Sequence, residues 1–515
     1  MMNTALIQSF DRVMNELYIE VKKEDFKNRC LALHKELNSP VMMMFAEDDR
    51  KENNDFKIYC VFLDKAARQW TIVKTKISPE SKKFEALSKD VYSASIFERQ
   101  IKEMFGIEAE GAIDLRSLAL HDEVWPKGYY PQLKDFKIPG HDNLKSGYLF
   151  NKIQGEGIFE IPVGPVHAGI IGPGHFRFSV AGEPIINLET RLGFTHRGVE
   201  KLFEGKKIEE AIALSECISG DSVFAYSVAF CNAIEKIYGI EVPYQSQLLR
   251  AIFLELERMY NHVSDIGGIA LDVGFSFCAN YAAIIKENIL SLNNELTNSR
   301  YLKGVNGIGG TSKKLDDKSR ILLINSLISI EKDFNELKKM LLSNASFMDR
   351  VEKTGILRKK TAEDLGITGV VARASGVPID LREISSETYK DEGFKLIKHQ
   401  EGDVLARLNV RVEEFIQSLN LIRRFESKIK YVILGQAQDD TCLKEGFALG
   451  YTEAWRGALL FWVRTNKEGL IERCKIVDPS VHNWHGLTFA VLENIVPDFP
   501  VCNKSFDLSY SGNDL

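Results

Sequence analysis

The chain has 515 residues, a formal net charge of −6, 44% hydrophobic residues and 27% charged residues. This composition is typical of a globular protein with two or more domains, and the acidic balance gives no support for a nucleic-acid partner. No apolar run reaches the roughly 18 to 20 residues that a membrane helix needs, and residues 1–28 lack the apolar core of a signal peptide. We therefore expect a protein that is made and kept in the cytoplasm.

The cysteines are scattered, and no two of them stand at the two-residue gap that zinc, iron–sulfur and redox sites use. We interpret them as buried free thiols in a reducing compartment. They are Cys30, Cys60, Cys217, Cys231, Cys278, Cys442, Cys474 and Cys502.

The first 140 residues alternate short strand-like runs with helical stretches. Residues 57–63 and 69–75 are β-branched and aromatic, which predicts two antiparallel strands joined by a turn. A helix is predicted over residues 83–105, ending at Gly106, and residues 125–141 indicate an extended linker. A strand-rich stretch follows at 157–188, with turns at Gly164-Pro165 and Gly172-Pro173-Gly174.

Long helices dominate from residue 206 onward. Apolar residues recur at three- and four-residue spacing in 245–266, and 282–302, 316–342 and 404–432 repeat this character. Residues 441–477 indicate strands, and 484–494 a closing helix. The fold class is therefore α+β: a mixed α/β domain over residues 1–140, then a helical bundle with a small β-rich portion over residues 141–515.

Several motifs carry a resemblance to a known family. Phe97–Ile107 (FERQIKEMFGI) and Asp114-Leu-Arg116 resemble the signature of the small peripheral-arm subunit of respiratory complex I. Thr195–Lys201 (THRGVEK) and Val371–Arg382 (VARASGVPIDLR) resemble its large, quinone-site subunit. The fusion of the two resembles the large subunit of formate-hydrogenlyase-type, membrane-bound nickel–iron hydrogenases. Further matches to that subunit are Gly164–His167, Pro173–Arg177 and Glu257-Arg258.

The resemblance implies two Cys-x-x-Cys pairs that hold nickel and iron, and this chain lacks both. Phe224-Ala-Tyr-Ser227 sets the register of the first pair, whose positions read Ser219 and Ser222. Asn483-Trp484, Asn494–Pro500 and Asp507-Leu508 set the register of the second, whose positions read Ser509 and Gly512.

A nickel–iron centre is held by soft thiolates, whereas a serine hydroxyl is hard and scarcely ionises near neutral pH, and glycine has no side chain. The single thiol of Cys217 cannot assemble such a centre. The chain also ends at Leu515, without the extension that hydrogenase maturation removes. We therefore expect no nickel–iron centre and no cofactor held within this chain.

The quinone site of complex I is matched only in part. Its loop histidine corresponds to His175 or His167, and its tyrosine position reads Gly220, while Tyr226 offers another hydroxyl nearby. Asp221 between the two serines is a candidate proton carrier, with a solvated or helix-capping acid as the alternative. In Glu453–Gly457, Arg456 corresponds to an arginine above the family's metal site and is a candidate cation for an anionic or quinone-like ligand.

Four further residues belong to the motifs themselves. The resemblance implies that His196, Arg197 and Arg373 help to bind a cofactor and that Glu200 takes part in protonation. The alternative for both motifs is structural, since such strings of charged residues also form buried salt-bridge corners.

The resemblance implies an oxidoreductase core subunit that couples electron transfer to ion movement. Electrons would come from an iron–sulfur cluster in an adjacent small subunit and pass to a quinone or another small acceptor. Further partners would be membrane subunits of the complex I or antiporter type, which places the chain on the cytoplasmic side of the inner membrane without spanning it. The alternatives are a redox-inactive scaffold and an active hydrogenase with unusual ligands.

Overall fold

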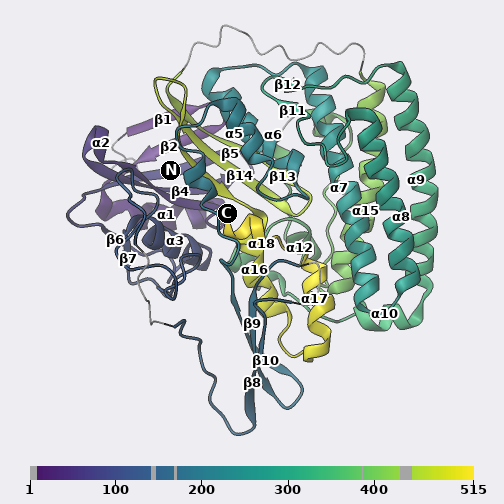
Figure 1. The fold of residues 1–515 in the computed structure, drawn as a ribbon, viewed down its shortest axis with the longest axis horizontal. Helices are drawn as coiled ribbons and strands as arrows, with labels where there is room; N and C mark the ends of the chain where they lie inside the picture. The colour runs from purple at the N-terminus through teal and green to yellow at the C-terminus, as the bar shows by residue number, and fades with distance from the viewer. Residues whose placement is uncertain (1–8, 141–146, 168–170, 386, 430–443) are drawn as a thin grey trace.

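The computed structural model describes residues 9–140, 147–167, 171–385, 387–429 and 444–515. It contains an amino-terminal α+β domain, a projecting three-stranded sheet, a bundle of long helices, and a carboxyl-terminal sheet with short helices (Figure 1). This confirms the predicted fold class. The predicted domain boundary at residue 140 borders residues 141–146, which lie outside the described residues.

The amino-terminal domain is built on a five-stranded sheet in the order β1-β2-β5-β4-β3, in which β2 and β5 run parallel and the other pairs antiparallel. The two strands predicted around the turn at 64–68 are confirmed, because β4 and β5 pair from Phe56 opposite Ile77 to Asp64 opposite Gln69. The elements are β1 (Ser9–Val13), β2 (Glu16–Glu20), α1 (Lys23–Leu37), β3 (Met43–Asp49), α2 (Arg50–Asn53), β4 (Asp55–Asp64) and β5 (Gln69–Ile77).

The predicted helix over residues 83–105 is correct only in its second half. The structure has β6 (Lys83–Glu85), a 3₁₀ turn (Tyr92–Ala94), α3 (Ser95–Phe105) and β7 (Glu108–Glu110). β6 pairs parallel with β7, which buries Phe84, and the Glu98 carboxylate accepts the backbone N–H groups of Leu87 and Ser88. These tertiary partners override the local helical pattern, whereas the end at Gly106, in the left-handed region, is as predicted.

The two domains share one apolar core at the carboxyl-terminal sheet, formed by β13 (Gly446–Ala454), β14 (Gly457–Thr465) and β15 (Ile471–Val477). The Trp462 ring of β14 lies 4.8 Å from the Phe45 ring and 5.2 Å from the Tyr59 ring. Its Nε1 donates to the Tyr18 hydroxyl at 3.2 Å. The amino-terminal sheet is thus fixed to the rest of the chain through buried aromatic contacts.

A second seam joins the domains where residues 114–120 lie against the projecting sheet. That sheet has the order β10-β9-β8 and consists of β8 (Ile158–Val163), β9 (His175–Ala181) and β10 (Ile185–Arg191). Glu103 of α3 accepts the backbone N–H groups of Leu118, Ala119 and Leu120. Gly193, with φ of +92°, lies so close that a Cβ there would be 2.5 Å from the Leu118 carbonyl oxygen.

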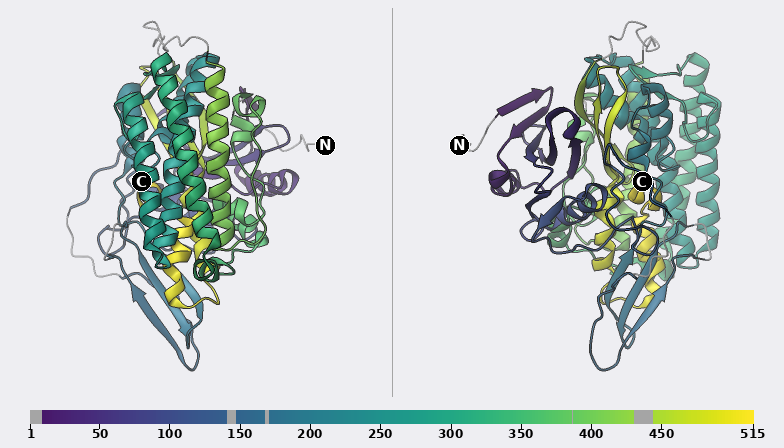
Figure 2. Two further views of the ribbon diagram at one scale, coloured as in Figure 1. Left: turned by 90° about the vertical axis from the view of Figure 1, so that its right-hand side faces the viewer. Right: turned by 60° about the vertical axis from the view of Figure 1, so that its left-hand side comes forward.

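Helix α7 of the bundle is buried along most of its length and packs against α8 and α15. The long helices of the bundle lie side by side (Figure 2). The predicted long helices are confirmed with shifted ends: α8 begins six residues before 282 and ends five before 302, and α15 ends at Ser427 instead of 432. Residues 430–432 lie outside the described residues. No helix among the described residues combines the length and apolar character needed to span a membrane. The elements are α4 (Val199–Leu202), α5 (Ile208–Ser215), α6 (Val223–Tyr238), α7 (Tyr244–Asp272), α8 (Ser276–Thr297), β11 (Asn306–Gly307), β12 (Gly310–Thr311), α9 (Asp317–Ser343), α10 (Ala345–Val351), α11 (Lys359–Leu365), α12 (Gly369–Ala374), α13 (Arg382–Ser385), α14 (Glu387–Asp391) and α15 (Val404–Ser427).

The carboxyl-terminal strands predicted within 441–477 are confirmed, with residues 441–443 outside the described residues. The closing helix begins five residues earlier than predicted, because Asp478 caps the N–H of Ser480 and Pro479 occupies the first turn. It ends at Ala490, before the predicted end at 494. The elements are α16 (Pro479–Ala490), a 3₁₀ turn (Val496–Asp498), α17 (Phe499–Phe506) and α18 (Tyr510–Asp514).

We predict that Gly193→Ala weakens the seam between the domains. The new Cβ would meet the Leu118 carbonyl at 2.5 Å and the Ala119 Cα at 2.7 Å, so the free energy of unfolding should fall by about 1–3 kcal/mol. Chemical denaturation and limited proteolysis of the 114–120 segment measure this. Gly128→Ala is the matched control, because Gly128 has a similar φ of +86° but no atom within 4 Å. An equal loss in both variants would show that backbone strain alone is responsible.

Candidate functional site

The four positions that the resemblance assigns to metal ligands meet in the folded chain. Ser219 precedes α6, and Ser509 precedes α18, yet their hydroxyl oxygens lie 2.9 Å apart. The Ser509 hydroxyl also accepts the backbone N–H of Gly512 at 2.9 Å, which makes it the cap of α18. Ser222 lies on the other side of Asp221, whose carboxylate accepts both the Ser219 and Ser222 hydroxyls, at 2.8 and 3.2 Å. We call Ser219, Asp221, Ser222, Arg456, Ser509 and Gly512 the serine–aspartate cluster.

Arg456 holds the Asp221 carboxylate with two parallel hydrogen bonds of 2.8 and 2.7 Å. Burial raises the pKa of Asp221, but the Arg456 guanidinium outweighs it and keeps that pKa below its ordinary value. The guanidinium stacks on the Trp455 ring at 3.9 Å, and the Trp455 indole N–H donates to the Ser222 hydroxyl at 3.0 Å. Asp221 is therefore ionised and fully hydrogen-bonded near neutral pH.

The space around Gly512 is closed by a second pair of buried groups. The Tyr226 hydroxyl donates to Asp478 at 2.6 Å, and a Cβ on Gly512 would lie 2.6 Å from that same carboxylate and 2.9 Å from the Tyr226 oxygen. A cysteine side chain at this position does not fit without moving Asp478 or Tyr226. Three of the four positions carry serine hydroxyls and the fourth is a glycine. The Ser219 and Ser509 hydroxyls bond to each other, and the Ser222 hydroxyl bonds to Asp221 and Trp455. Such hard hydroxyl donors differ from the soft thiolates that hold a nickel–iron centre.

No group of three or more His, Cys, Asp and Glu side chains suited to hold a metal is found among the described residues. Cys217 is exposed, and its sulfur accepts from Lys303 Nζ at 3.5 Å. Cys442 lies outside the described residues.

His196 and Arg197 fasten the segments that carry the cluster. His196 Nδ1 lies 2.7 Å from the carbonyl oxygen of Asp514, at the end of α18. The Arg197 guanidinium donates to the carbonyls of Cys217 and Ile218, the two residues before Ser219, at 3.1 and 2.9 Å. The Thr-His-Arg motif thus holds both chain segments that meet at the cluster, the one before Ser219 and the one that contains Asp514. Its predicted cofactor-binding role stays a prediction.

Glu200 and Arg373 lie in buried ion-pair networks. Glu200 pairs with Arg473 and Lys475 of β15, each at 2.9 Å. Burial raises the pKa of Glu200, but Lys475 and Arg473 together lower it below its ordinary value, so the carboxylate stays charged. Arg373 pairs with Glu414 and Glu453, both at 2.7 Å, and with Asp380 at 3.3 Å. Both residues thus make buried salt bridges of the kind that the sequence analysis gave as the structural alternative to a functional role.

The two candidate loop histidines brace the turn between β8 and β9. His167 Nε2 lies 2.8 Å from the Gly174 carbonyl oxygen, and His175 Nδ1 lies 3.3 Å from the Gly164 carbonyl oxygen. Burial lowers the pKa of His175, which is therefore neutral near pH 7, and its buried Nε2 has no hydrogen-bond partner among the described residues. Gly172 and Gly174 of this turn pack against Tyr510, directly after Ser509. The turn therefore lies beside the cluster.

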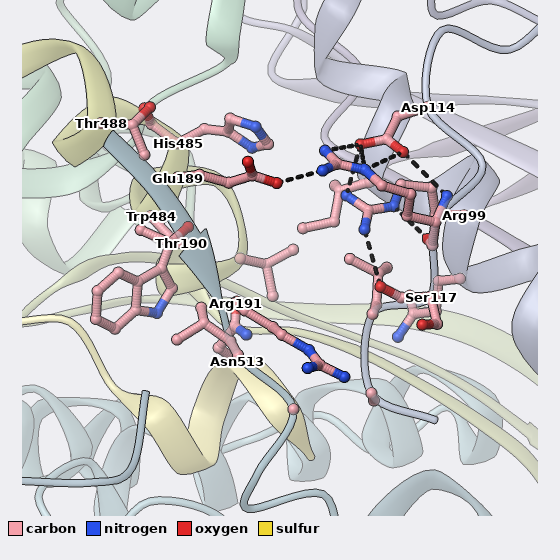
Figure 3. Close-up of a pocket in the computed structure, with 18 of the residues that line it drawn as sticks. Arg99, Asp114, Ser117, Glu189, Thr190, Arg191, Trp484, His485, Thr488 and Asn513 are labelled. Carbon is pink, nitrogen blue, oxygen red and sulfur yellow. Dashed lines mark hydrogen bonds and ion pairs between the residues drawn. The ribbon is translucent and has the colours of Figure 1, made fainter. Parts of the chain in front are cut away.

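A cavity of about 290 Å³ separates the amino-terminal domain from the segment that ends at α18 (Figure 3). Asp114 binds Arg99 and Arg116 on one side, and Arg116 reaches across to Glu189 of β10. The Asp114-Leu-Arg116 motif therefore joins the domains, and Asn513 and Asp514 also line the cavity.

Sequence reasoning missed a second group of charged side chains next to the cluster, some buried and some partly exposed. Asp507 binds Lys504 at 2.7 Å, and Asp265 of α7 accepts from Arg411 at 2.8 Å and lies 3.4 Å from Lys504. The only signal in the sequence was Asp265, an aspartate on the buried face of the long apolar helix α7. That signal does not identify the residues with which Asp265 pairs.

Two models of known families match the chain. Residues 19–142 match the 30 Kd subunit of respiratory-chain NADH dehydrogenase, and residues 272–441 match its 49 Kd subunit. The class is therefore that of chains that fuse these two types of domain.

Similarity to individual proteins supports the same class. The chain is 30% identical to hydrogenase-4 component G of Escherichia coli K12, over 92% of this chain and 83% of that protein. It is also 30% identical to formate hydrogenlyase subunit 5 of the same organism, over 92% and 84%. A solved chain from the archaeal membrane-bound sulfane sulfur reductase is 26% identical with a TM-score of 0.64, covering 70% of this chain and 99% of that one.

The chain belongs to this family of complex I-type and hydrogenase-type large subunits, and its relatives are subunits of membrane-bound respiratory complexes.

We predict that Arg373→Met lowers the free energy of unfolding by about 3–5 kcal/mol, because it leaves buried carboxylates without their cation. Burial together with Asp380 raises the pKa of Glu453 to about 7, so Glu453→Gln in the same chain should recover part of the loss. Chemical denaturation measures both. Arg423→Met, which breaks the partly exposed pair with Glu331, is the control and should cost less than about 1 kcal/mol. A small loss at Arg373 would contradict the role of this network.

Proposed function

We propose that the chain is the core large subunit of a membrane-associated, energy-converting oxidoreductase complex that works without a nickel–iron site of its own. The observation that supports this proposal is the serine–aspartate cluster. Ser219, Ser222, Ser509 and Gly512 converge as the four ligand positions of a hydrogenase would, but they present hydrogen-bonded hydroxyls and a glycine without room for a side chain.

In this proposal, electrons arrive from an iron–sulfur cluster in an adjacent small subunit and reduce a quinone or another small acceptor. A quinone takes up two electrons and two protons, so the site needs a cation to stabilise developing negative charge and groups that supply protons. Arg456 is the buried cation, and Asp221 with its two serine hydroxyls is the polar path. The membrane subunits then use this charge change to move ions, and the chain sits on their cytoplasmic side.

A second candidate is a redox-inactive scaffold that transmits movement or supports assembly. Its support is that the Arg456 guanidinium is already engaged by Asp221 and Asp507, and that Tyr226 and Asp478 fill the space beside Gly512. A filled polar cluster needs no substrate to be stable.

We predict that the purified complex contains far less than one nickel atom per chain, because hydroxyls do not hold nickel as thiolates do. Elemental analysis by mass spectrometry measures nickel and iron together, and iron from the partner's cluster serves as the internal control for an intact complex. Stoichiometric nickel would contradict the proposal and favour a hydrogenase with unusual ligands.

We predict that Asp221→Asn slows electron transfer from the reduced complex to a quinone or a sulfur compound by about 10²-fold or more, as loss of a proton-transferring group typically does. Stopped-flow spectroscopy of cluster oxidation measures the rate. Asp349→Asn, at an exposed position, is the control and should leave it unchanged. A wild-type complex that transfers electrons to no quinone, sulfur compound or ferredoxin would favour the scaffold.

A further inference from the structure

Charged side chains of alternating sign lead away from the serine–aspartate cluster into the bundle. Arg456, which holds Asp221, also reaches Asp507, with its Nη2 3.4 Å from the carboxylate. Asp507 binds Lys504 of α17 at 2.7 Å, and the same Lys504 ammonium lies 3.4 Å from Asp265 of α7. Asp265 is therefore connected to the cluster by an unbroken series of side chains.

Asp265 is buried, and charged groups from each packed segment face it. Arg411 comes from α15, Lys504 from α17, and Asp507 from the turn after α17. Burial and the neighbouring Asp507 raise the pKa of Asp265 to about 7, although Lys504 and Arg411 oppose this. Burial alone would raise the pKa of Asp507 as well, but Lys504 and Arg456 hold it well below its ordinary value. The pair therefore consists of one permanently charged carboxylate and one that gains and loses a proton near neutral pH.

On helix α7, the series of charged side chains continues from the buried Asp265 to Asp272 at the surface. Asp265, Gly268 and Asp272 stand three and four residues apart and so share one face of the helix. Gly268 leaves the room in which Lys504 lies, since a Cβ there would be 2.1 Å from the Lys504 Cε. Asp272 ends α7 at an exposed position, where burial of its carboxyl still raises its pKa and Lys504 lowers it. The Lys504 ammonium thus interacts electrostatically with both Asp265 and Asp272.

We propose that Asp265 is a proton-carrying residue that takes up one proton from solvent, by way of Asp272, when an electron reaches an acceptor at the serine–aspartate cluster. This role rests on the proposed function. The electron comes from the partner's iron–sulfur cluster, the proton comes from water, and the Asp265 carboxylate becomes a neutral carboxylic acid. The physical reason is Coulombic: a negative charge added nearby in a low-dielectric interior favours the protonated form of a carboxyl group.

The titration of Asp265 is tested without any electron transfer. Infrared spectra of the assembled complex, recorded across pH 5 to 9, should show a protonated-carboxyl C=O band that disappears with a midpoint near 7. The Asp265 component should be lost from this band in Asp265→Asn and kept in Asp317→Asn, whose side chain is 99% exposed, while the components of Glu453 and Glu257, whose pKa values are raised to about 7 and about 8, remain in both. Asp265→Glu guards against misfolding, because it should keep a titrating band at a shifted frequency. A band that persists unchanged in Asp265→Asn would overturn the proposal.

Thermal stability gives a second readout. The ordinary pKa of this carboxyl is 3.8 and the folded value is about 7, so between these values the folded chain holds a proton that the unfolded chain has released. The contribution of Asp265 to stability is therefore lost progressively as pH rises through this range. Asp265→Asn should flatten the fall of Tm with rising pH relative to Asp317→Asn. Equal slopes in the two variants would count against a titrating Asp265.

Proton uptake on reduction connects this residue to electron transfer. In weakly buffered solution with a pH-sensitive dye, reduction of the wild-type complex should take up about one proton more than reduction of Asp265→Asn, while Asp272→Asn should slow the uptake about tenfold and leave its amount unchanged. Equal uptake by wild type and Asp265→Asn in a complex that does transfer electrons would overturn the proposal and leave the proposed function intact. If no electron transfer occurs but the Asp265 component of the infrared band is still lost in Asp265→Asn, the proposed function fails and Asp265 remains a titrating group.

Discussion

The interior of this protein is organised around buried arginines that bind carboxylates from different segments. Arg373 of α12, Arg382 of α13 and Arg258 of α7 share Glu255, Asp380, Glu414 and Glu453, and all of these side chains are buried. Removing such charges from water costs several kcal/mol per ion, which only paired and well-oriented partners can offset. Each pair therefore requires the others to be in place, and α7, α12, α13, α15 and β13 can adopt only one mutual arrangement.

The candidate site depends on this arrangement. Arg258 donates to the carbonyls of Glu453 and Ala454, the residues directly before Trp455 and Arg456. The ion-pair network thereby sets where the Arg456 guanidinium stands, and Arg456 in turn holds Asp221. From the opposite side, Arg197 fixes the backbone before Ser219, and His196 contacts the end of α18. The cluster is thus held from both sides by hydrogen bonds to the segments that carry it.

This construction explains how a site keeps its shape while its donor atoms differ from those of a hydrogenase. Contacts from outside the ligand positions help to fix the backbone segments that carry Ser219 and Ser509: Arg197 donates to the carbonyls before Ser219, and His196 contacts the end of α18. Hydroxyls there can hydrogen-bond to each other and to Asp221, so no buried polar atom of the serines is left without a partner. The result is an ionised, hydrogen-bonded cluster connected to Asp265, and we propose that it moves protons and charge.

The sequence by itself determined the fold class, the strands at 57–63 and 69–75, the long helices of the bundle, and the family, because periodicity and motifs are local properties of the chain. It also determined that no thiol stands at the four expected ligand positions. The tertiary structure alone decided that Lys83–Glu85 is a strand, since its partner β7 supplies the missing hydrogen bonds. It alone decided that Ser219 and Ser509, 290 residues apart, touch, and that Asp265 faces Asp507 and Lys504. Such contacts depend on how separate helices pack, and a single sequence does not encode that packing in any local pattern.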